Sequence, residues 1–187
     1  MTFEAFFGLV SAAMATGLLF ARFARPNAKI LYSNNAVIAP FKEGKALMVR
    51  IINQRSSQLI NIEAQIIFSW MHEKEGRRIR HYHTLPLDRQ KVTFFPLHWT
   101  IVHEIDEKSP LHNKDKEYLK RSEAEMFVLI SATDETYSQI VHSRSSYRFD
   151  EIVWGAKFKD IFVRGNEGKA IGVNMNRIHD FEHVELG

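Results

Sequence analysis

Histidines and adjacent acidic residues are the side chains of this 187-residue sequence that could do chemistry. Among nine histidines, His81 and His83 alternate, so a strand would present both imidazoles on one face, where a metal could bind. No further ligand stands at a spacing that completes such a site, and we expect solvated or core-edge histidines. The acidic pairs at 134–135 and 150–151 are poor acid–base partners, because neighbours on a strand point to opposite faces.

Motifs of common catalytic sites are also missing from the sequence. It contains no Gly-rich phosphate loop, no G-x-S-x-G elbow and no H-E-x-x-H pair. The lack of cysteine excludes disulfides and thiolate zinc sites, and a net charge of +3 is too small to indicate nucleic acid. We therefore expect no enzyme, no metal site, no cofactor and no nucleic-acid partner.

The elements that organise the chain are revealed by its charge distribution. Glu4 is the one charged residue before residue 22, and residues 5–21 form an uncharged, apolar run. Its length approaches the ~20 residues that a helix needs to span a bilayer. A signal peptide would begin with basic residues and end at a small-residue cleavage site, which 21–24 is not. A core helix would usually show a polar stripe. We therefore predict a transmembrane helix at 1–25, with the signal peptide and the core helix as alternatives.

The flanks of the apolar run predict its orientation. Arg22, Arg25 and Lys29 follow it, which by the positive-inside rule places the C-terminal flank in the cytoplasm. A linker at 26–35 would then lead to a cytoplasmic domain at 36–187. An outside N-terminus with so short a tail also leads us to expect earlier membrane segments upstream.

One face of the predicted helix carries mostly small side chains. Gly8, Ala12 and Thr16 recur every fourth residue, and Phe20 continues the row. Small residues allow membrane helices to approach closely or to line a narrow path. If several copies cross around an axis, Phe20 would form an apolar ring that closes a pore by dewetting. The alternative is that the row only packs two helices together. Gly8 and Gly17 are candidate hinges.

The remainder of the chain is rich in short β-type runs. Branched and aromatic residues predict strands, with a hairpin at 73–78, a short helix near 115–122 and a turn at 150–155. The predicted strands are 47–52, 62–70, 79–87, 93–99 with an edge or bulge at Pro96, 126–132, 139–145 and 157–163. Since β-α-β alternation is absent, we predict a mainly β fold, an immunoglobulin-like β-sandwich preceded by one transmembrane helix.

Three separated segments carry a resemblance to a known family. They are GLLFARFARP at 17–26, LHWTIVHEIDEKSPL at 97–111, and SRSSY at 143–147 followed by DEIVWG at 150–155. In this order the chain resembles inward rectifier potassium channels, most closely the prokaryotic branch, over nearly its whole length. The resemblance implies a homotetramer in the bacterial inner membrane with potassium as the permeating ion. It also implies voltage-gated and lipid-regulated conduction.

Part of that family's pattern is not in this sequence. The outer helix, the pore helix and the T-x-G-Y/F-G selectivity filter should precede Glu4. We therefore expect the chain to be the inner-helix and cytoplasmic gating portion of a longer channel. The alternative is a stand-alone, membrane-anchored β-sandwich adaptor or a channel subunit without a filter.

Within the helix, the resemblance assigns roles to the row of small residues. Phe20 matches the bulky residue at the lower gate, Gly8 the inner-helix hinge, and Ala12 a pore-lining cavity position. An acid at that position favours polyamine block in strongly rectifying relatives. Because Ala12 is neutral, we expect weak block by polyamines or magnesium.

In the cytoplasmic domain, the resemblance assigns a vestibule and an ion pair. Glu63 matches a pore-lining acid, and four copies would attract cations. A second acidic ring of the family falls at Ser131, so we expect weaker attraction. Glu135 and Arg144 match residues that can pair across a hairpin near the subunit contact, a structural role.

Four bases match positions that meet anionic lipids in the family: Arg22, Arg25, Lys29 and Arg55. Additional bases of lipid-controlled relatives are replaced here by Asn27, Ala28 and Ser56. Ordinary positive-inside anchoring is the alternative explanation for these bases.

Overall fold

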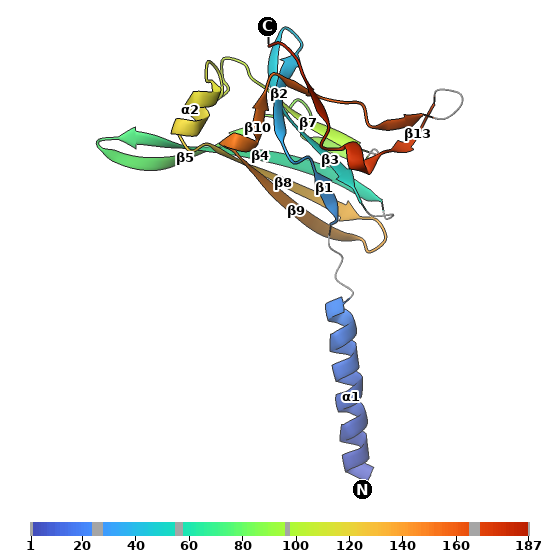
Figure 1. Cartoon of the computed structure of the whole chain (residues 1–187). Coiled ribbons are helices and arrows are strands. Elements are labelled where there is room, and N and C mark those ends of the chain that lie inside the picture. Colours follow the sequence, from blue (N-terminus) through green and yellow to red (C-terminus); the bar gives the residue numbers. More distant parts are fainter. Residues whose placement is uncertain (1, 24–27, 55–57, 96–97, 165–168, 187) are drawn as a thin grey trace.

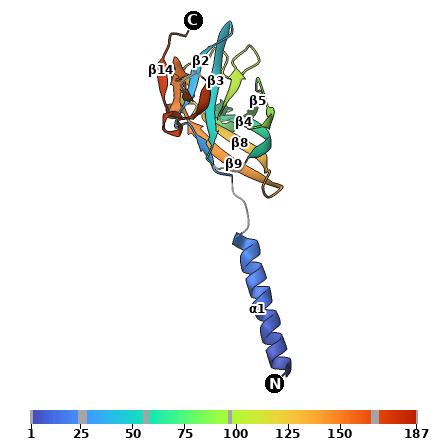
Figure 2. The same ribbon diagram turned by 90° about the vertical axis from the view of Figure 1, so that its right-hand side faces the viewer.

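The computed structural model describes residues 2–23, 28–54, 58–95, 98–164 and 169–186. Helix α1 (Thr2–Phe23) extends away from a β-rich domain that holds the rest of the chain (Figures 1 and 2). The window Phe3–Phe20 is long and apolar enough to cross a membrane, and none of it is buried. A core helix would be buried by the protein, so the structure argues against that alternative.

Among the described residues, most strands form two five-stranded sheets (Figure 1). The first sheet contains β1 (Ile30–Tyr32), β3 (Gly44–Asn53), β2 (Ala36–Phe41) and β10 (Ile152–Trp154) in that order, with β7 (His98–Glu104) paired to β3. The second contains β5 (Arg77–Leu85), β4 (Leu59–Lys74), β8 (Glu125–Asp134) and β9 (Gln139–Arg148), with β6 (Lys91–Phe94) paired to β4. All pairs in these sheets are antiparallel except β2 with β10.

Smaller elements complete the domain. Two short two-stranded sheets pair β11 (Ala156–Phe158) with β14 (Phe181–His183) and β12 (Phe162–Arg164) with β13 (Ala170–Val173). The helical elements are α2 (Lys116–Arg121) and the 3₁₀ turns η1 (Phe149–Glu151) and η2 (Met175–Arg177).

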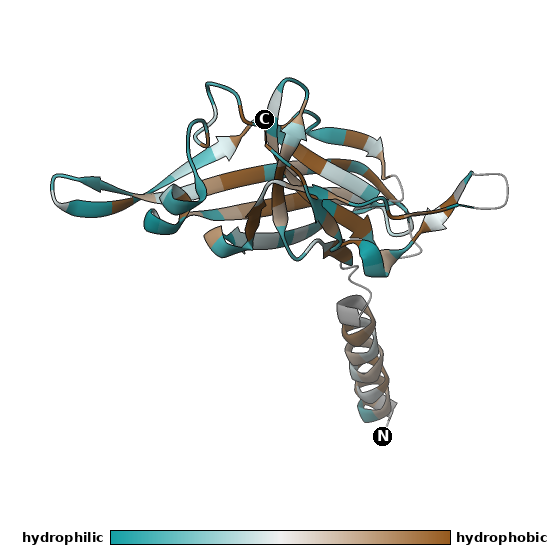
Figure 3. Cartoon of the chain, turned by 45° about the horizontal axis from the view of Figure 1, so that its top comes forward, coloured by the Kyte–Doolittle hydropathy of each residue, from teal (hydrophilic) through white to brown (hydrophobic). Residues whose placement is uncertain are grey.

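The core lies between the two large sheets. Alternate residues such as Val49 and Ile51 of β3, Ile66 and Phe68 of β4 and Val128 of β8 are fully buried in one cluster. Figure 3 shows hydrophobic residues along the central strands and hydrophilic ones at the hairpin ends. The predicted mainly β sandwich with one N-terminal apolar helix is therefore confirmed.

Several local predictions are confirmed by specific contacts. Helix α2 begins after Asp115, whose Oδ1 accepts a hydrogen bond from the backbone N–H of Tyr118 at 2.7 Å. The 73–78 hairpin joins β4 to β5, and its turn uses Glu75 and Gly76, with φ of 54° and 72°.

Other boundaries differ from the prediction. The expected strand 93–99 is two strands in different sheets, since β6 pairs with β4 and β7 with β3; Pro96 lies outside the described residues. The expected strand 157–163 is interrupted between β11 and β12, where Asp160 Oδ1 accepts a hydrogen bond from the Phe162 N–H. The expected turn at 150–155 contains β10, and the expected linker 26–35 contains β1.

The segment 98–111 is held in place by a buried histidine. His103 Nδ1 donates to the Pro86 carbonyl at 2.7 Å, and Nε2 accepts from the Ser109 hydroxyl at 2.8 Å. The Leu111 N–H in turn donates to Ser109 Oγ at 3.2 Å. Burial lowers the pKa of His103, so the neutral imidazole fastens this connection to the end of β5.

The segment 150–155 ends at a glycine that the packing requires. Gly155 has φ of 63°, and a Cβ there would lie 2.8 Å from the Val184 carbonyl oxygen. Its own carbonyl accepts a hydrogen bond from the Val184 N–H at 2.8 Å. The C-terminal strand is thereby attached close to the first sheet.

Candidate functional site

The predicted row on α1 lies on an unbroken helix. Thr16 Oγ1 donates to the Ala12 carbonyl at 2.8 Å, which satisfies the hydroxyl without water. Phe20 is 74% exposed in the single chain and is free to contact other copies. The helix is continuous through Gly8 and Gly17, and a Cβ at either would meet nothing within 4 Å. The hinge at these glycines stays a prediction.

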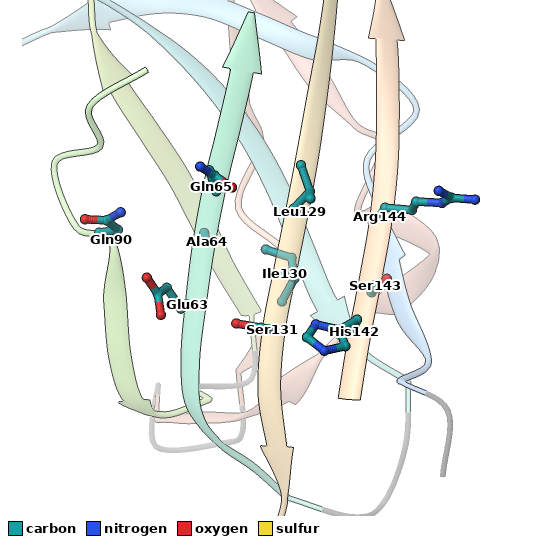
Figure 4. A pocket seen from close by; sticks show the side chains of 10 residues that line it. All are labelled: Glu63, Ala64, Gln65, Gln90, Leu129, Ile130, Ser131, His142, Ser143 and Arg144. Carbon is teal, nitrogen blue, oxygen red and sulfur yellow. The ribbon is translucent and has the colours of Figure 1, made fainter. Parts of the chain in front are cut away.

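Three polar side chains form a row on the outer face of the second sheet. Glu63 of β4 is directly opposite Ser131 of β8, which is directly opposite His142 of β9. Directly opposed residues have Cβ atoms about 4.5–5.5 Å apart. Figure 4 shows the three side chains at one level on adjacent strands. The register therefore assembles a polar row from residues up to 79 positions apart in sequence.

A shallow hollow surrounds this row. Its volume is about 660 Å³, and its lining adds Gln65, Leu129 and Arg144, which form a second row across the same strands. The residues alternate with buried ones, so the hollow lies on the outer face of the sandwich. Next to it, Ile67 and Phe127 line a more apolar depression. This face therefore combines a charged part with an apolar part.

Two tyrosines connect the start of the β domain to the strand that carries His142. The Tyr147 hydroxyl donates to the Ser33 carbonyl at 2.7 Å, and the Tyr32 hydroxyl donates to Ser143 Oγ at 2.9 Å. Burial raises the pKa of each tyrosine to about 12, so both stay protonated donors at neutral pH. The segment nearest α1 is thus attached to the edge of the hollow.

The predicted ion pair between Glu135 and Arg144 does not form across the β8–β9 hairpin of one chain. Arg144 is opposite Leu129, six residues before Glu135. At about 3.3 Å per residue, the two positions are about 20 Å apart along the strands. The prediction is wrong within a chain because the register, which sequence matching does not reveal, separates the two side chains.

The predicted lipid-contacting bases are only partly described. Lys29 is exposed just before β1. Arg25 and Arg55 lie outside the described residues, as does the side chain of Arg22. Their role stays a prediction.

Sequence reasoning missed several residues of this site. His142 and Gln65 carry no motif, and only the strand register places them beside Glu63 and Ser131. The available signal was the alternation of polar and apolar residues in the sequences of β4 and β8, because it indicates which residues point outward from the sheet. Of the two histidines considered as metal ligands in the sequence, His81 stacks on Trp70 with ring centres 5.7 Å apart. The described residues hold no group of three potential metal ligands.

Comparisons with known proteins match the chain to one family. The inward rectifier potassium channel C-terminal domain family matches residues 30–187. Inward rectifier potassium channel Kirbac3.1 of Paramagnetospirillum magnetotacticum is 35% identical over 181 residues, covering 96% of this chain and 61% of that protein. Inward rectifier potassium channel 4 of Homo sapiens and of Mesocricetus auratus is 32% identical over 188 residues, covering 92% of this chain and 40% of theirs.

The chain therefore spans less than two thirds of the length of these relatives. Among solved structures, the sporulation control protein Spo0M of Bacillus subtilis aligns with a TM-score of 0.33 and 13% identity, over 69% of this chain and 50% of that one. So low a score carries no argument about fold or function.

Proposed function

The chain belongs to the inward rectifier potassium channel family, whose named members are ion channels and not enzymes, and we propose that it forms the inner helix and cytoplasmic gating portion of such a channel. Four copies would surround a potassium path, with α1 in the membrane and the sandwich in the cytoplasm. The observation that carries the proposal is an exposed apolar helix placed directly before a domain of this family.

The lower gate in this proposal is a ring of Phe20. The side chain is exposed near the C-terminal end of α1, one turn beyond Thr16, in the row that begins at Gly8. Four phenyl rings around an axis would exclude water and ions when they approach one another. Rotation or bending of α1 would open the ring.

The vestibule in this proposal is the row of Glu63, Ser131 and His142. Each copy would present one carboxylate, and the four together would raise the local concentration of potassium. Ser131 contributes no charge, which limits the attraction to a single acidic ring. The adjacent apolar depression at Ile67 and Phe127 is then a surface for the neighbouring copy.

Lipid contact in this proposal comes from bases at the membrane end of the domain. Each base near an anionic leaflet contributes about 1 kcal/mol of attraction. Lys29 directly precedes β1, and β1 is attached to β9 through the Tyr32 hydroxyl. Lipid binding at the linker would therefore act on the strand that carries His142.

Oligomeric state is the first test. Size-exclusion chromatography with light scattering on the full chain in detergent should give a tetramer. A monomer would favour the alternative of a membrane-anchored adaptor, because the vestibule and the gate both need four copies.

Ion flux is the second test. Residues 1–187 would replace the matched region of the Paramagnetospirillum magnetotacticum relative, and potassium flux into liposomes would be measured. Phe20→Ala should raise flux in the closed state, whereas Leu19→Ala should not, because consecutive residues of α1 point in different directions and Leu19 is outside the row of 8, 12, 16 and 20. Glu63→Gln should lower flux at low salt, and Glu73→Gln at the hairpin should not. Equal effects within either pair would contradict the assigned roles.

A further inference from the structure

A series of stacked rings on one face of the β4–β5 hairpin ends in two histidines. Phe68 stacks on Trp70 with ring centres 5.5 Å apart, and Trp70 stacks on His81 with ring centres 5.7 Å apart. The ring of His72 then contacts that of His81 edge to face, with centres 5.5 Å apart and 77° between the two planes. Because Phe68 is fully buried, the series is anchored in the core and holds His81 beside His72.

The strand register brings these two histidines together. Trp70 is directly opposite His81, and His72 lies two residues further along β4, so the two histidines are diagonal neighbours on one face. In the sequence, His81 and His83 are the more obvious pair, because they alternate on one strand. The ring contact forms instead across the hairpin, between residues 72 and 81.

The spacing of the two imidazoles fits a shared metal ion. Ring nitrogens bind zinc at about 2.0–2.1 Å, so two imidazoles on one tetrahedral ion have ring centres about 5 Å apart. The observed 5.5 Å is close to that value. Both histidines are exposed, so each ring can turn a nitrogen toward the ion. The alternative is an ordinary edge-to-face contact, which would involve no metal.

Other side chains on this face determine which metals suit the site. Lys74 and Arg77 are directly opposite each other at the next level toward the tip, and the face carries no carboxylate along the paired positions 66–74 and 77–85. Mg²⁺ and Ca²⁺ prefer oxygen ligands and would be repelled by the two bases. Imidazole suits copper, nickel and zinc. Since the described residues hold no group of three potential ligands, water would complete the coordination.

The hairpin has only two strands at this level. β4 is paired with β8 as far as Ser69, and the Met71 N–H donates to the Ser122 carbonyl at 2.6 Å. From His72 to the tip, the strand pairing of β4 in the described chain is with β5 alone, and Figure 1 shows this end projecting from the sheet. Because a two-stranded ribbon is only marginally stable in water, a metal link between the strands would stabilise it.

We propose that His72 and His81 form a binding site for one divalent transition-metal ion of the copper or zinc type, with water as the remaining ligands. The ion joins β4 to β5 beside Trp70. Because both ligands belong to one hairpin of one chain, the site does not depend on the proposed channel assembly.

Quenching of Trp70 fluorescence by Cu²⁺ tests the proposal on the untagged full chain in detergent. Cu²⁺ binds nitrogen ligands most tightly among the divalent first-row ions, and it quenches nearby tryptophans. We expect saturable quenching at one ion per chain, reversed by a chelator. Trp70→Phe should remove most of the quenching, because Trp99 and Trp154 belong to the first sheet. Zn²⁺, which does not quench, should compete with Cu²⁺, and Mg²⁺ should not.

Variants of single histidines locate the site. His72→Gln and His81→Gln should each weaken the apparent affinity for Cu²⁺ at least about tenfold, because each removes one of two nitrogen ligands. His183→Gln is the matched control, an exposed histidine on β14, and should leave the affinity unchanged. Zn²⁺ should also slow hydrogen exchange of the backbone amides at 72–79, because the metal links the two strands there.

Four results would overturn the proposal. His72→Gln could bind Cu²⁺ as tightly as the unmodified chain while His81→Gln does not, which would indicate His81 with His83. Quenching could persist fully in Trp70→Phe, which would place the ion elsewhere. Mg²⁺ could compete as well as Zn²⁺, which would show only general attraction of cations. Zn²⁺ could leave hydrogen exchange in the hairpin unchanged, which would exclude a link between the strands.

Discussion

The hydrogen bond from Tyr147 to Ser33 should make a measurable contribution to the stability of the sandwich. Ser33 is 2% exposed, so Tyr147→Phe would leave a buried carbonyl oxygen without its hydroxyl donor. An unsatisfied buried acceptor costs about 1–3 kcal/mol, and we expect a loss of about 2 kcal/mol. For a domain of this size that corresponds to a decrease in melting temperature of about 4–8 °C.

Tyr32→Phe is the matched control, because it removes an equivalent hydroxyl from a less buried bond. The partner, Ser143 Oγ, is half-buried and can turn toward water. We expect a loss below about 1 kcal/mol. Urea unfolding of the full chain in detergent, followed by the fluorescence of tryptophans that all lie in the β domain, would measure both variants. Equal losses of unfolding free energy in the two variants, or a loss for Tyr147→Phe below about 0.5 kcal/mol, would refute the stabilising role given to the bond from Tyr147 to Ser33.

The same variant has a signature in its pH dependence. Burial raises the pKa of Tyr147 to about 12, above the unfolded value near 10. The native state therefore holds the proton more tightly, and stability from this group decreases as pH rises above about 10. Tyr147→Phe should flatten that decrease, which a structural disturbance elsewhere would not do.

Further predictions concern conduction and acid stability. Ser131→Glu, beside Glu63, should raise inward conductance of the reconstituted channel at low salt and should destabilise the sheet by about 0.2–1 kcal/mol, since like charges would face each other across strands. An unchanged conductance would show that the vestibule is not limiting. Ala12→Asp should convert weak block by spermine into steep block in current–voltage curves, whereas steep block in the unmodified chain would contradict our expectation. Burial lowers the pKa of His98 and of His103, so unfolded histidine binds protons first and stability should decrease as pH falls below about 6.5, the unfolded value. The substitution His103→Gln should reduce this loss of stability, measured by urea titrations between pH 5 and pH 7. If the stability of the variant changes with pH as much as that of the unmodified chain, His103 is not a source of the acid sensitivity.

The sequence predicted long, strongly patterned elements well and short ones poorly. The runs around Ile51 and Phe68 are apolar enough to define β3 and β4, and Asp115 marks the start of α2. In contrast, β1, β10 and β12 have three residues each and are stabilised by their partners rather than by their own propensity. The amino-acid composition of such a short segment does not indicate which strand it will pair with.

The residues of the candidate site were likewise predictable in part and missed in part. Glu63 could be chosen from a family match, but its neighbour His142 follows only from the register of two strand pairs. The same register separates Glu135 from Arg144. Outside this site, the buried Arg50 did give a signal, because a base inside the apolar run 46–52 indicates that both faces of the strand are covered. The sequence did not reveal that the C-terminal strands are the part of the chain that covers Arg50.

The pairing of β2 with β10 has a consequence for how the protein is made. Ala36 is aligned with Ile152 in the parallel pair of β2 and β10, and the Ser33 carbonyl accepts a hydrogen bond from Tyr147 nearby. During synthesis, α1 leaves the ribosome before the β domain, whereas β2 and Ser33 obtain the partners Ile152 and Tyr147 only after more than 100 further residues have been made. In the proposed channel, membrane insertion of α1 would therefore precede completion of the fold, and the sandwich would fold at the membrane surface, where other copies would be concentrated.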